Sequence, residues 1–108
     1  SAPGAVVHGL PDHVTPDVAG HHEVLTEIRR ALPDVPALVQ AVVAEDDLLA
    51  VRIRYTGTHQ GVLRGVAPTG RVLSWEAMTF RRFDNVGRVV ERWIIGDDLS
   101  LLRQLGLL

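Results

Sequence analysis

The stretch RVLSWEAMTFRRFDNVGRVVERWIIGD, residues 71–97, decides the fold. Two runs rich in β-branched, aromatic and large apolar residues flank turn residues at 84–87, a pattern that predicts two antiparallel strands. On the second strand, alternation places Trp93 and Asp97 on the same face. If the sheet bends around this face, both side chains point into a pocket. A carboxylate at the end of an apolar strand face is a candidate for proton transfer, because apolar surroundings disfavour the charged form.

The rest of the chain predicts an α+β domain. Working outward from the hairpin, the patterns indicate a short edge strand at 5–10, a helix at 20–32, strands at 35–44 and 48–58, a glycine-rich loop at 59–70 and a short helix after residue 97. A helix, several antiparallel strands at short spacing and a terminal helix favour a strongly bent sheet wrapped on helices, with a pocket inside the bend. Alternation alone does not decide which strand face lines that pocket, because β-bulges change the parity.

The composition limits the classes of function. A chain of 108 residues is long enough for one core, so we expect a single domain over residues 1–108. A net charge of -2 gives no basic excess for nucleic acid, and no apolar run approaches the ~20 residues of a membrane helix. With no targeting segment visible, we expect a cytoplasmic protein. The absence of Cys excludes thiolate metal sites, and the absence of Lys excludes an imine mechanism.

Four motifs carry a family resemblance: GTHQG at 57–61, GVAPTGR at 65–71, RRFDNVGRVVERW at 81–93 and GDDLSLLRQLG at 96–106. Their order and spacing resemble the SnoaL-like polyketide cyclases, bacterial proteins of the nuclear-transport-factor-two-like superfamily. The resemblance implies a cone-shaped, strongly curved antiparallel sheet wrapped on helices, the SnoaL-like or cystatin-like α+β barrel. Family members usually open with one or two helices before the equivalent of residues 6–8, so the resemblance also implies that this chain is incomplete at its N-terminus.

The resemblance further implies a function in bacterial natural-product biosynthesis, including antibiotics. The implied reaction is a cofactor-free, metal-free intramolecular aldol-type ring closure of a polyketide-like small molecule. Asp97 would be the general acid and base, and His8 would donate a hydrogen bond to the developing enolate or to the substrate carbonyl. Substrate-binding residues would be Trp93, Trp75, His59, Tyr55 and Met78.

Each of these residues also has a structural interpretation. Asp97 or Asp98 can cap the terminal helix, and the pattern alone favours a cap; the resemblance favours catalysis for Asp97 and capping for Asp98. His8 is a candidate surface residue, the aromatic residues are candidate core, and His59 lies in a loop whose glycines indicate tight turns. His21 and His22 are adjacent on a helix and point about 100° apart, which argues against a metal site.

Two other classes of function are compatible with the same fold. The first is an epoxide hydrolase or isomerase, which requires a second carboxylate converging on Asp97; Glu76 is the candidate, with Arg52 as a further polar group. The second is a non-catalytic ligand-binding or dimerisation module, which predicts an exposed or helix-capping Asp97. In every case we expect a homodimer that pairs through open sheet faces.

Overall fold

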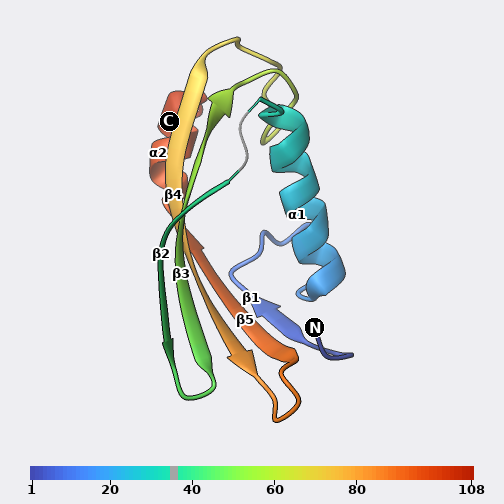
Figure 1. Ribbon diagram of the computed structural model, residues 1–108. Helices are drawn as coiled ribbons and strands as arrows, with labels where there is room; N and C mark the ends of the chain where they lie inside the picture. The colour runs from blue at the N-terminus through green and yellow to red at the C-terminus, as the bar shows by residue number, and fades with distance from the viewer. Residues whose placement is uncertain (35–36) are drawn as a thin grey trace.

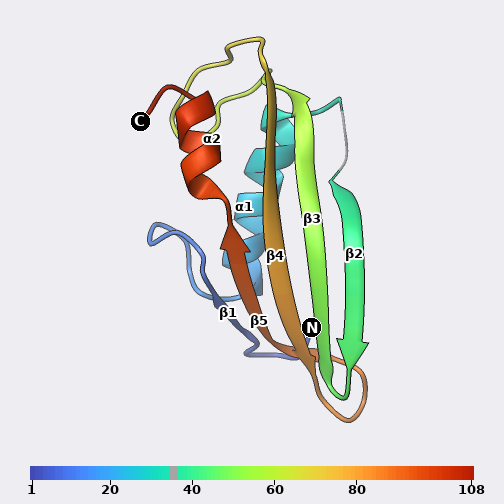
Figure 2. The same cartoon turned by 90° about the vertical axis from the view of Figure 1, so that its left-hand side faces the viewer.

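The computed structural model describes residues 1–34 and 37–108. Within these residues the elements are, in order, β1 (Val6–His8), α1 (Val18–Ala31), β2 (Leu38–Glu45), β3 (Leu48–Thr58), β4 (Val72–Phe83), β5 (Val89–Gly96) and α2 (Asp98–Gln104). The strands form one curved layer, and α1 lies across its concave face (Figure 1). Helix α2 lies beside β4 (Figure 2). Neither described helix has the length and apolar character needed to cross a membrane.

The strand order in the sheet is β1-β5-β4-β3-β2. All neighbouring strands are antiparallel except β1 and β5, which are parallel. The predicted α+β fold with a strongly curved sheet is therefore confirmed. The sheet is mixed rather than purely antiparallel because the first strand pairs with the last. It does not close into a barrel among the described strands, since β1 and β2 lie at opposite ends of the order.

The predicted hairpin is present, with β4 and β5 joined by a tight turn. The Asp84 carboxylate accepts hydrogen bonds from the backbone N–H groups of Val86, at 3.0 Å, and Arg88, at 2.9 Å. Gly87 has φ +83°, a conformation that favours glycine. Hydrogen bonds from Arg88 lower the pKa of the Asp84 carboxyl, so the turn is held by an ionised side chain at neutral pH.

The second hairpin, β2 and β3, extends away from α1 (Figure 1). The strand predicted at 48–58 has the observed bounds of β3. Strand β2 begins at Leu38 and ends at Glu45, and residues 35–36 of the predicted strand lie outside the described residues. Every residue of β2 is exposed. The edge of the sheet opposite β1 therefore has both faces uncovered.

Helix α1 begins two residues earlier than the sequence predicts, because Asp17 caps it. The Asp17 carboxylate accepts a hydrogen bond from the Gly20 N–H at 2.9 Å and another from the Thr15 hydroxyl at 2.6 Å. The Thr15 hydroxyl and the Gly20 N–H lower the pKa of that carboxyl. A Cβ at residue 20 would meet the Thr15 carbonyl oxygen at 1.8 Å, so only glycine fits here. The start of α1 is thus fixed against the preceding loop.

The hydrophobic core lies where the ends of both helices meet the start of β4. Its buried members are Ala31, Leu32, Leu63, Leu73, Trp75, Leu101 and Leu105. The Gln104 side chain ties α2 to β4, because its amide accepts from the Ser74 N–H at 2.9 Å and donates to the Ser74 carbonyl at 2.8 Å. Gly106 follows α2 with φ +76°, a conformation typical of a glycine that follows a helix.

We expect Leu101→Ala to lower the free energy of unfolding by about 2–5 kcal/mol, because truncating a buried leucine removes apolar contacts and leaves a cavity. Leu101 is only 2% exposed. Leu99→Ala is the matched control in the same helix: Leu99 is 51% exposed, so its truncation should change stability by less than about 0.5 kcal/mol. Urea unfolding followed by circular dichroism measures both. Equal losses in the two variants would contradict this orientation of α2.

Candidate functional site

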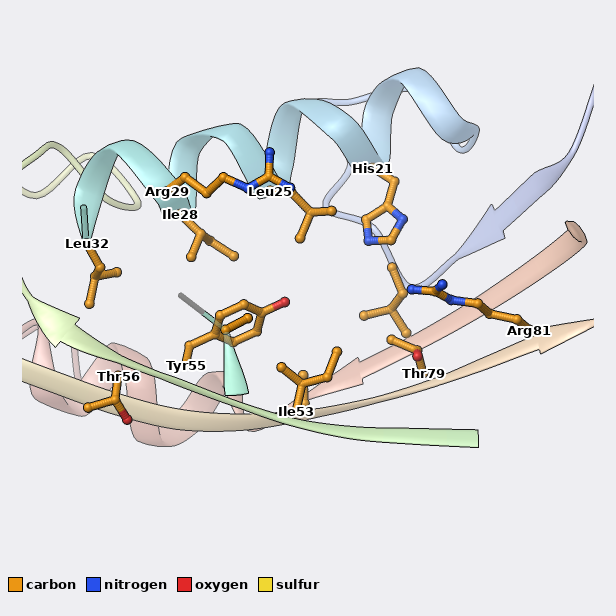
Figure 3. A pocket seen from close by; sticks show the side chains of 13 residues that line it. His21, Leu25, Ile28, Arg29, Leu32, Ile53, Tyr55, Thr56, Thr79 and Arg81 are labelled. Atoms are coloured by element: carbon orange, nitrogen blue, oxygen red, sulfur yellow. The ribbon is translucent and has the colours of Figure 1, made fainter. Parts of the chain in front are cut away.

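A cavity of about 300 Å³ lies between α1 and the concave face of the sheet. Apolar side chains from both layers make much of its wall: Leu25, Ile28, Leu32, Ile53, Ala77 and Ile94. Figure 3 shows His21, Thr79 and Arg81 gathered at one end, with the Tyr55 hydroxyl pointing toward them. The described residues that line this cavity include no Asp or Glu. It is therefore a chamber with largely apolar walls and a polar end that carries Arg81, and a further arginine, Arg29, lines it from α1.

A second hollow of about 230 Å³ adjoins the first, since both are lined by His21, Tyr55 and Ile94. It reaches the start of α2, where Asp98 lies on its wall. Asp98 Oδ1 accepts a hydrogen bond from the Arg64 guanidinium at 3.3 Å. The Asp98 side chain keeps 58% of its surface exposed, so this carboxylate sits at the mouth of the hollow. We call the two adjoining hollows together the inner chamber.

His21 is the buried titratable group of the inner chamber, only 5% exposed. Its Nδ1 lies 3.0 Å from Nη1 of Arg92. Burial, together with the charges of Arg92 and Arg81, lowers the pKa of His21 to about 4. His21 is thus neutral at pH 7. Among the described residues no group of three or more His, Asp or Glu side chains is placed to hold a metal ion.

Tyr55 and Trp75 form an aromatic wall in the inner chamber. Their rings stack with centroids 5.1 Å apart and planes at 28°. Burial raises the pKa of Tyr55, so its hydroxyl stays protonated and can donate a hydrogen bond at neutral pH. Both residues were predicted to bind substrate, and both line the second hollow. A flat aromatic wall of this kind suits a planar ligand.

The strand face that lines the inner chamber is the one opposite to our expectation. On β5 the lining residues are Ile94 and Gly96, whereas Trp93 and Ile95 line a groove on the outer face of the sheet. Met78 of β4 lines the same outer groove and is 59% exposed. Trp93 and Met78 are therefore placed away from the chamber. The prediction was one residue out of phase, because nothing in the alternation itself distinguishes the two faces.

Asp97 is the N-cap of α2, and it does not line the inner chamber. Its carboxylate accepts a hydrogen bond from the Ser100 N–H at 3.1 Å, and the residue is exposed. The expectation that Asp98 caps the helix is wrong: Asp98 is the first helical residue, and the residue before it supplies the cap. The catalytic role predicted for Asp97 stays a prediction.

His8 lies on the outer side of the sheet edge. Its Nε2 is 2.6 Å from the Glu91 carboxylate, and its ring stacks on Trp93 with centroids 5.4 Å apart. The His8 side chain is 47% exposed, and it lines neither hollow of the inner chamber. A hydrogen bond from His8 and the charge of Arg82 lower the pKa of Glu91, whose carboxylate also pairs with Arg82. The catalytic role of His8 likewise stays a prediction.

His59 is fully buried in the loop that joins β3 to β4. Its Nδ1 accepts a hydrogen bond from the Thr69 N–H at 3.3 Å. Its backbone N–H donates to the Arg71 carbonyl and its carbonyl accepts from the Gly70 N–H, which joins the start of the loop to its end. Gly61 packs on the end of α1, where a Cβ would meet the Arg30 carbonyl oxygen at 2.5 Å. The GTHQG motif thus docks the loop on the helix. His59 lines neither hollow.

Glu76 and Arg52, the extra polar groups of the hydrolase hypothesis, also lie outside the inner chamber. The Glu76 carboxylate is held by the Arg54 guanidinium at 2.9 Å. Arg52 is exposed and lines the outer groove. Neither hollow of the inner chamber is lined by both Glu76 and Asp97, so the paired acids that an epoxide hydrolase needs are not brought together there.

The residues of the inner chamber that sequence reasoning missed include His21, Thr79 and Arg81 at its basic end and Asp98 at its mouth. A usable signal existed on β4, since residues 75, 77, 79 and 81 alternate with the outward Met78 and share the parity of the buried Trp75. His21 lies four residues before Leu25 on the same stripe of α1. Once Trp75 is placed in the core, the other three chamber residues on this strand, Ala77, Thr79 and Arg81, follow from the alternation.

Comparison with known proteins identifies a family that has this fold. A family model described as SnoaL-like polyketide cyclase matches residues 1–105. The chain belongs to the SnoaL-like polyketide cyclase family. None of the curated proteins compared with the chain is a significant match.

Solved structures of this family share the fold. AclR of Streptomyces galilaeus, a proposed hydroxylase, is 34% identical with a TM-score of 0.84, over 99% of this chain and 66% of AclR. IdmH of Streptomyces antibioticus, a proposed polyketide cyclase, is 36% identical with a TM-score of 0.76, over 97% of this chain and 81% of IdmH. TsrD of Streptomyces laurentii, at 22% identity and a TM-score of 0.82 over 99% of this chain and 78% of TsrD, shows the fold alone.

Burial of His21 predicts a pH dependence of stability. The pKa of His21 is about 4 when folded and 6.5 in an unperturbed chain, so between these values the unfolded state binds a proton that the folded state does not. Lowering the pH from about 7 to about 5 should therefore reduce the free energy of unfolding by roughly 2 kcal/mol through this residue. In His21→Gln that part of the loss should vanish. Urea unfolding of both proteins at the two pH values tests this, and an identical pH dependence would count against it.

Proposed function

We propose that this protein is a cytoplasmic bacterial enzyme that closes a ring in a polyketide-like intermediate by an intramolecular aldol-type reaction. The observation that carries the proposal is the inner chamber: an apolar cavity with a stacked aromatic wall and one carboxylate, Asp98, at its mouth. Membership of the SnoaL-like polyketide cyclase family supports the same substrate class.

In this proposal the Asp98 carboxylate is the base. It removes a proton from a methylene flanked by two carbonyl groups, and the resulting enolate carbon attacks a second carbonyl of the same molecule to form a carbon–carbon bond. The new alkoxide then takes the proton back from the Asp98 carboxylic acid, so the enzyme returns to its starting state. Arg64, 3.3 Å from Asp98, orients the carboxylate toward the chamber.

The aromatic wall helps to hold the flexible substrate in the folded conformation that ring closure requires. A flexible chain must bring two of its own atoms together before a ring can form, and a shaped apolar cavity reduces that entropic cost. The stacked rings of Tyr55 and Trp75 offer a planar surface for the growing ring system. The Tyr55 hydroxyl is a hydrogen-bond donor for a carbonyl oxygen in the chamber.

Asp98→Asn should lower turnover by about 100-fold or more, because the amide cannot remove a proton. Asp97→Asn is the matched control: Asn is also a good N-cap, so α2 stays capped and turnover should change by less than about threefold. Ring closure of a 1,3-dicarbonyl polyketide intermediate, followed by mass spectrometry, measures both. The opposite ranking would assign the chemistry to Asp97 as the family resemblance predicts, and ligand binding without turnover would favour a non-catalytic binding module.

We also propose that two copies of the chain pair through the outer face of the sheet. Four exposed apolar side chains gather around the outer groove, which has a volume of about 340 Å³: Val43, Met78, Phe80 and Ile95. Exposed apolar patches on a sheet face are typical of interfaces, and a second copy presents the same self-complementary patch.

Ile95→Asp should convert the dimer to a monomer, because a charge would be buried in an apolar contact. Ile95 is 77% exposed in the single chain, so the substitution should leave folding intact. Val86→Asp is the control, since Val86 is 73% exposed but lies in the turn between β4 and β5. Sedimentation velocity distinguishes the two states. A wild-type protein that sediments as a monomer at all concentrations would refute the pairing.

A further inference from the structure

The basic end of the inner chamber concentrates positive charge without a matching acid. Arg81 and Arg92 are direct cross-strand partners on β4 and β5, so their side chains start from neighbouring positions on the same face, and burial together with the charge of Arg81 lowers the pKa of Arg92. The ion pairs found among the described residues use Arg54, Arg64, Arg82 and Arg88, and neither Arg81 nor Arg92 takes part in one. Neighbouring like charges repel, so this pair is unfavourable unless an anion compensates it.

Three polar atoms at the same end are buried without a hydrogen-bond partner. They are Thr79 Oγ1, Arg81 Nε and Arg92 Nε. Thr79 is only 6% exposed, and it lines the inner chamber beside Arg81. Leaving a buried polar group unpaired costs on the order of 1–3 kcal/mol, so such atoms point to a partner that binds there.

The orientation of His21 adds a further donor. Arginine can only donate, so the contact between Arg92 Nη1 and His21 Nδ1 makes Nδ1 the acceptor and leaves the proton on Nε2. Figure 3 shows the His21 ring lying next to the Arg81 guanidinium at the end of the cavity. A neutral His21 with its proton on Nε2 is thus a fixed donor for an oxygen atom. Arg92 contacts the Ser1 hydroxyl as well, and it acts behind His21 rather than in the cavity.

We propose that Arg81, His21 and Thr79 form a binding site for the carboxylate of an apolar or aromatic acid, with Arg92 as a positioning residue for His21. A planar guanidinium matches a carboxylate, and the apolar remainder of the chamber accepts the hydrocarbon part of the ligand. If the ligand of this site is the substrate, the inference rests on the proposed ring closure. The intermediate would then enter as a free acid, with its carboxylate at the Arg81 end and its reactive methylene toward Asp98.

The register of the sheet fixes that direction. Asp98 follows Gly96, which pairs with Ala77 on β4, whereas Arg81 lies four residues further along the same strand. The acidic mouth and the basic end are therefore separated along β4. Tyr55 and Ile94 line both hollows and so belong to the stretch that joins the two ends. A ligand held by its carboxylate at one end would present its other end to Asp98.

The test compares 2-naphthoate with 2-naphthamide, which has the same shape but no charge, by isothermal titration calorimetry at low salt. We expect the wild-type protein to bind the carboxylate at least about tenfold more tightly. In Arg81→Gln the preference should fall to within about twofold while the affinity for the amide is kept. Arg52→Gln removes an arginine from the opposite face of the same sheet and should keep the full preference.

Thr79→Val provides a second variant that removes the unpaired hydroxyl with little change of shape, and it should reduce the preference severalfold. Equal affinity of the wild type for both probes, no binding of either, or a preference that survives Arg81→Gln would overturn the proposal. Binding of these probes needs no turnover. A protein that prefers the carboxylate but closes no ring would therefore keep this site and lose only the proposed ring closure.

Discussion

The packing of α1 against the concave face of the sheet is the constraint on which the rest of the structure depends. One end of the helix is held by the loop after β3, where the Gln60 and Gly61 N–H groups donate to the Ala31 carbonyl at 2.8 and 3.2 Å. The other end is fixed by the Asp17 cap. Between these anchors, the apolar stripe of α1 faces the sheet without filling the space completely. The cavity is therefore a consequence of how the helix is tethered.

Polar groups divide the inner chamber into two chemically different ends. The mouth carries a carboxylate that keeps contact with water and with Arg64, whereas the far end carries arginines and a histidine kept neutral by burial. Apolar and aromatic side chains separate them. In the function we propose, this distribution gives a bound molecule a preferred direction, because charge recognition and proton transfer take place at opposite ends. The outer groove, by contrast, is lined chiefly by exposed apolar side chains and suits a protein partner better than a small polar ligand.

The sequence predicted the elements better than it predicted the site. Strand β3, the turn at Asp84 and the glycine after α2 follow from local chemistry, and the motifs indicated the family. The site depends on which strand face points inward, and a shift of one residue exchanges Trp93 for Ile94. The N–H groups at the start of α2 require an acceptor from the residue before the helix, and Asp97 supplies it, as the sequence pattern alone favours; its catalytic role stays a prediction. The sequence pattern suggests only a possible metal ligand for His21. Its contact with Arg92 could not be predicted, because the two residues are 71 positions apart in the chain.

The central claim is that the inner chamber, rather than the outer groove, receives the ligand. The adjacent residues Ile94 and Ile95 report on the two faces, since Ile94 lines the chamber and Ile95 lines the outer groove. Intermolecular nuclear Overhauser effects between 2-naphthoate and methyl-labelled isoleucines measure this directly. The account predicts contacts to the methyl groups of Ile94 and Ile53 and none to Ile95. Contacts to Ile95 without any to Ile94 would contradict it.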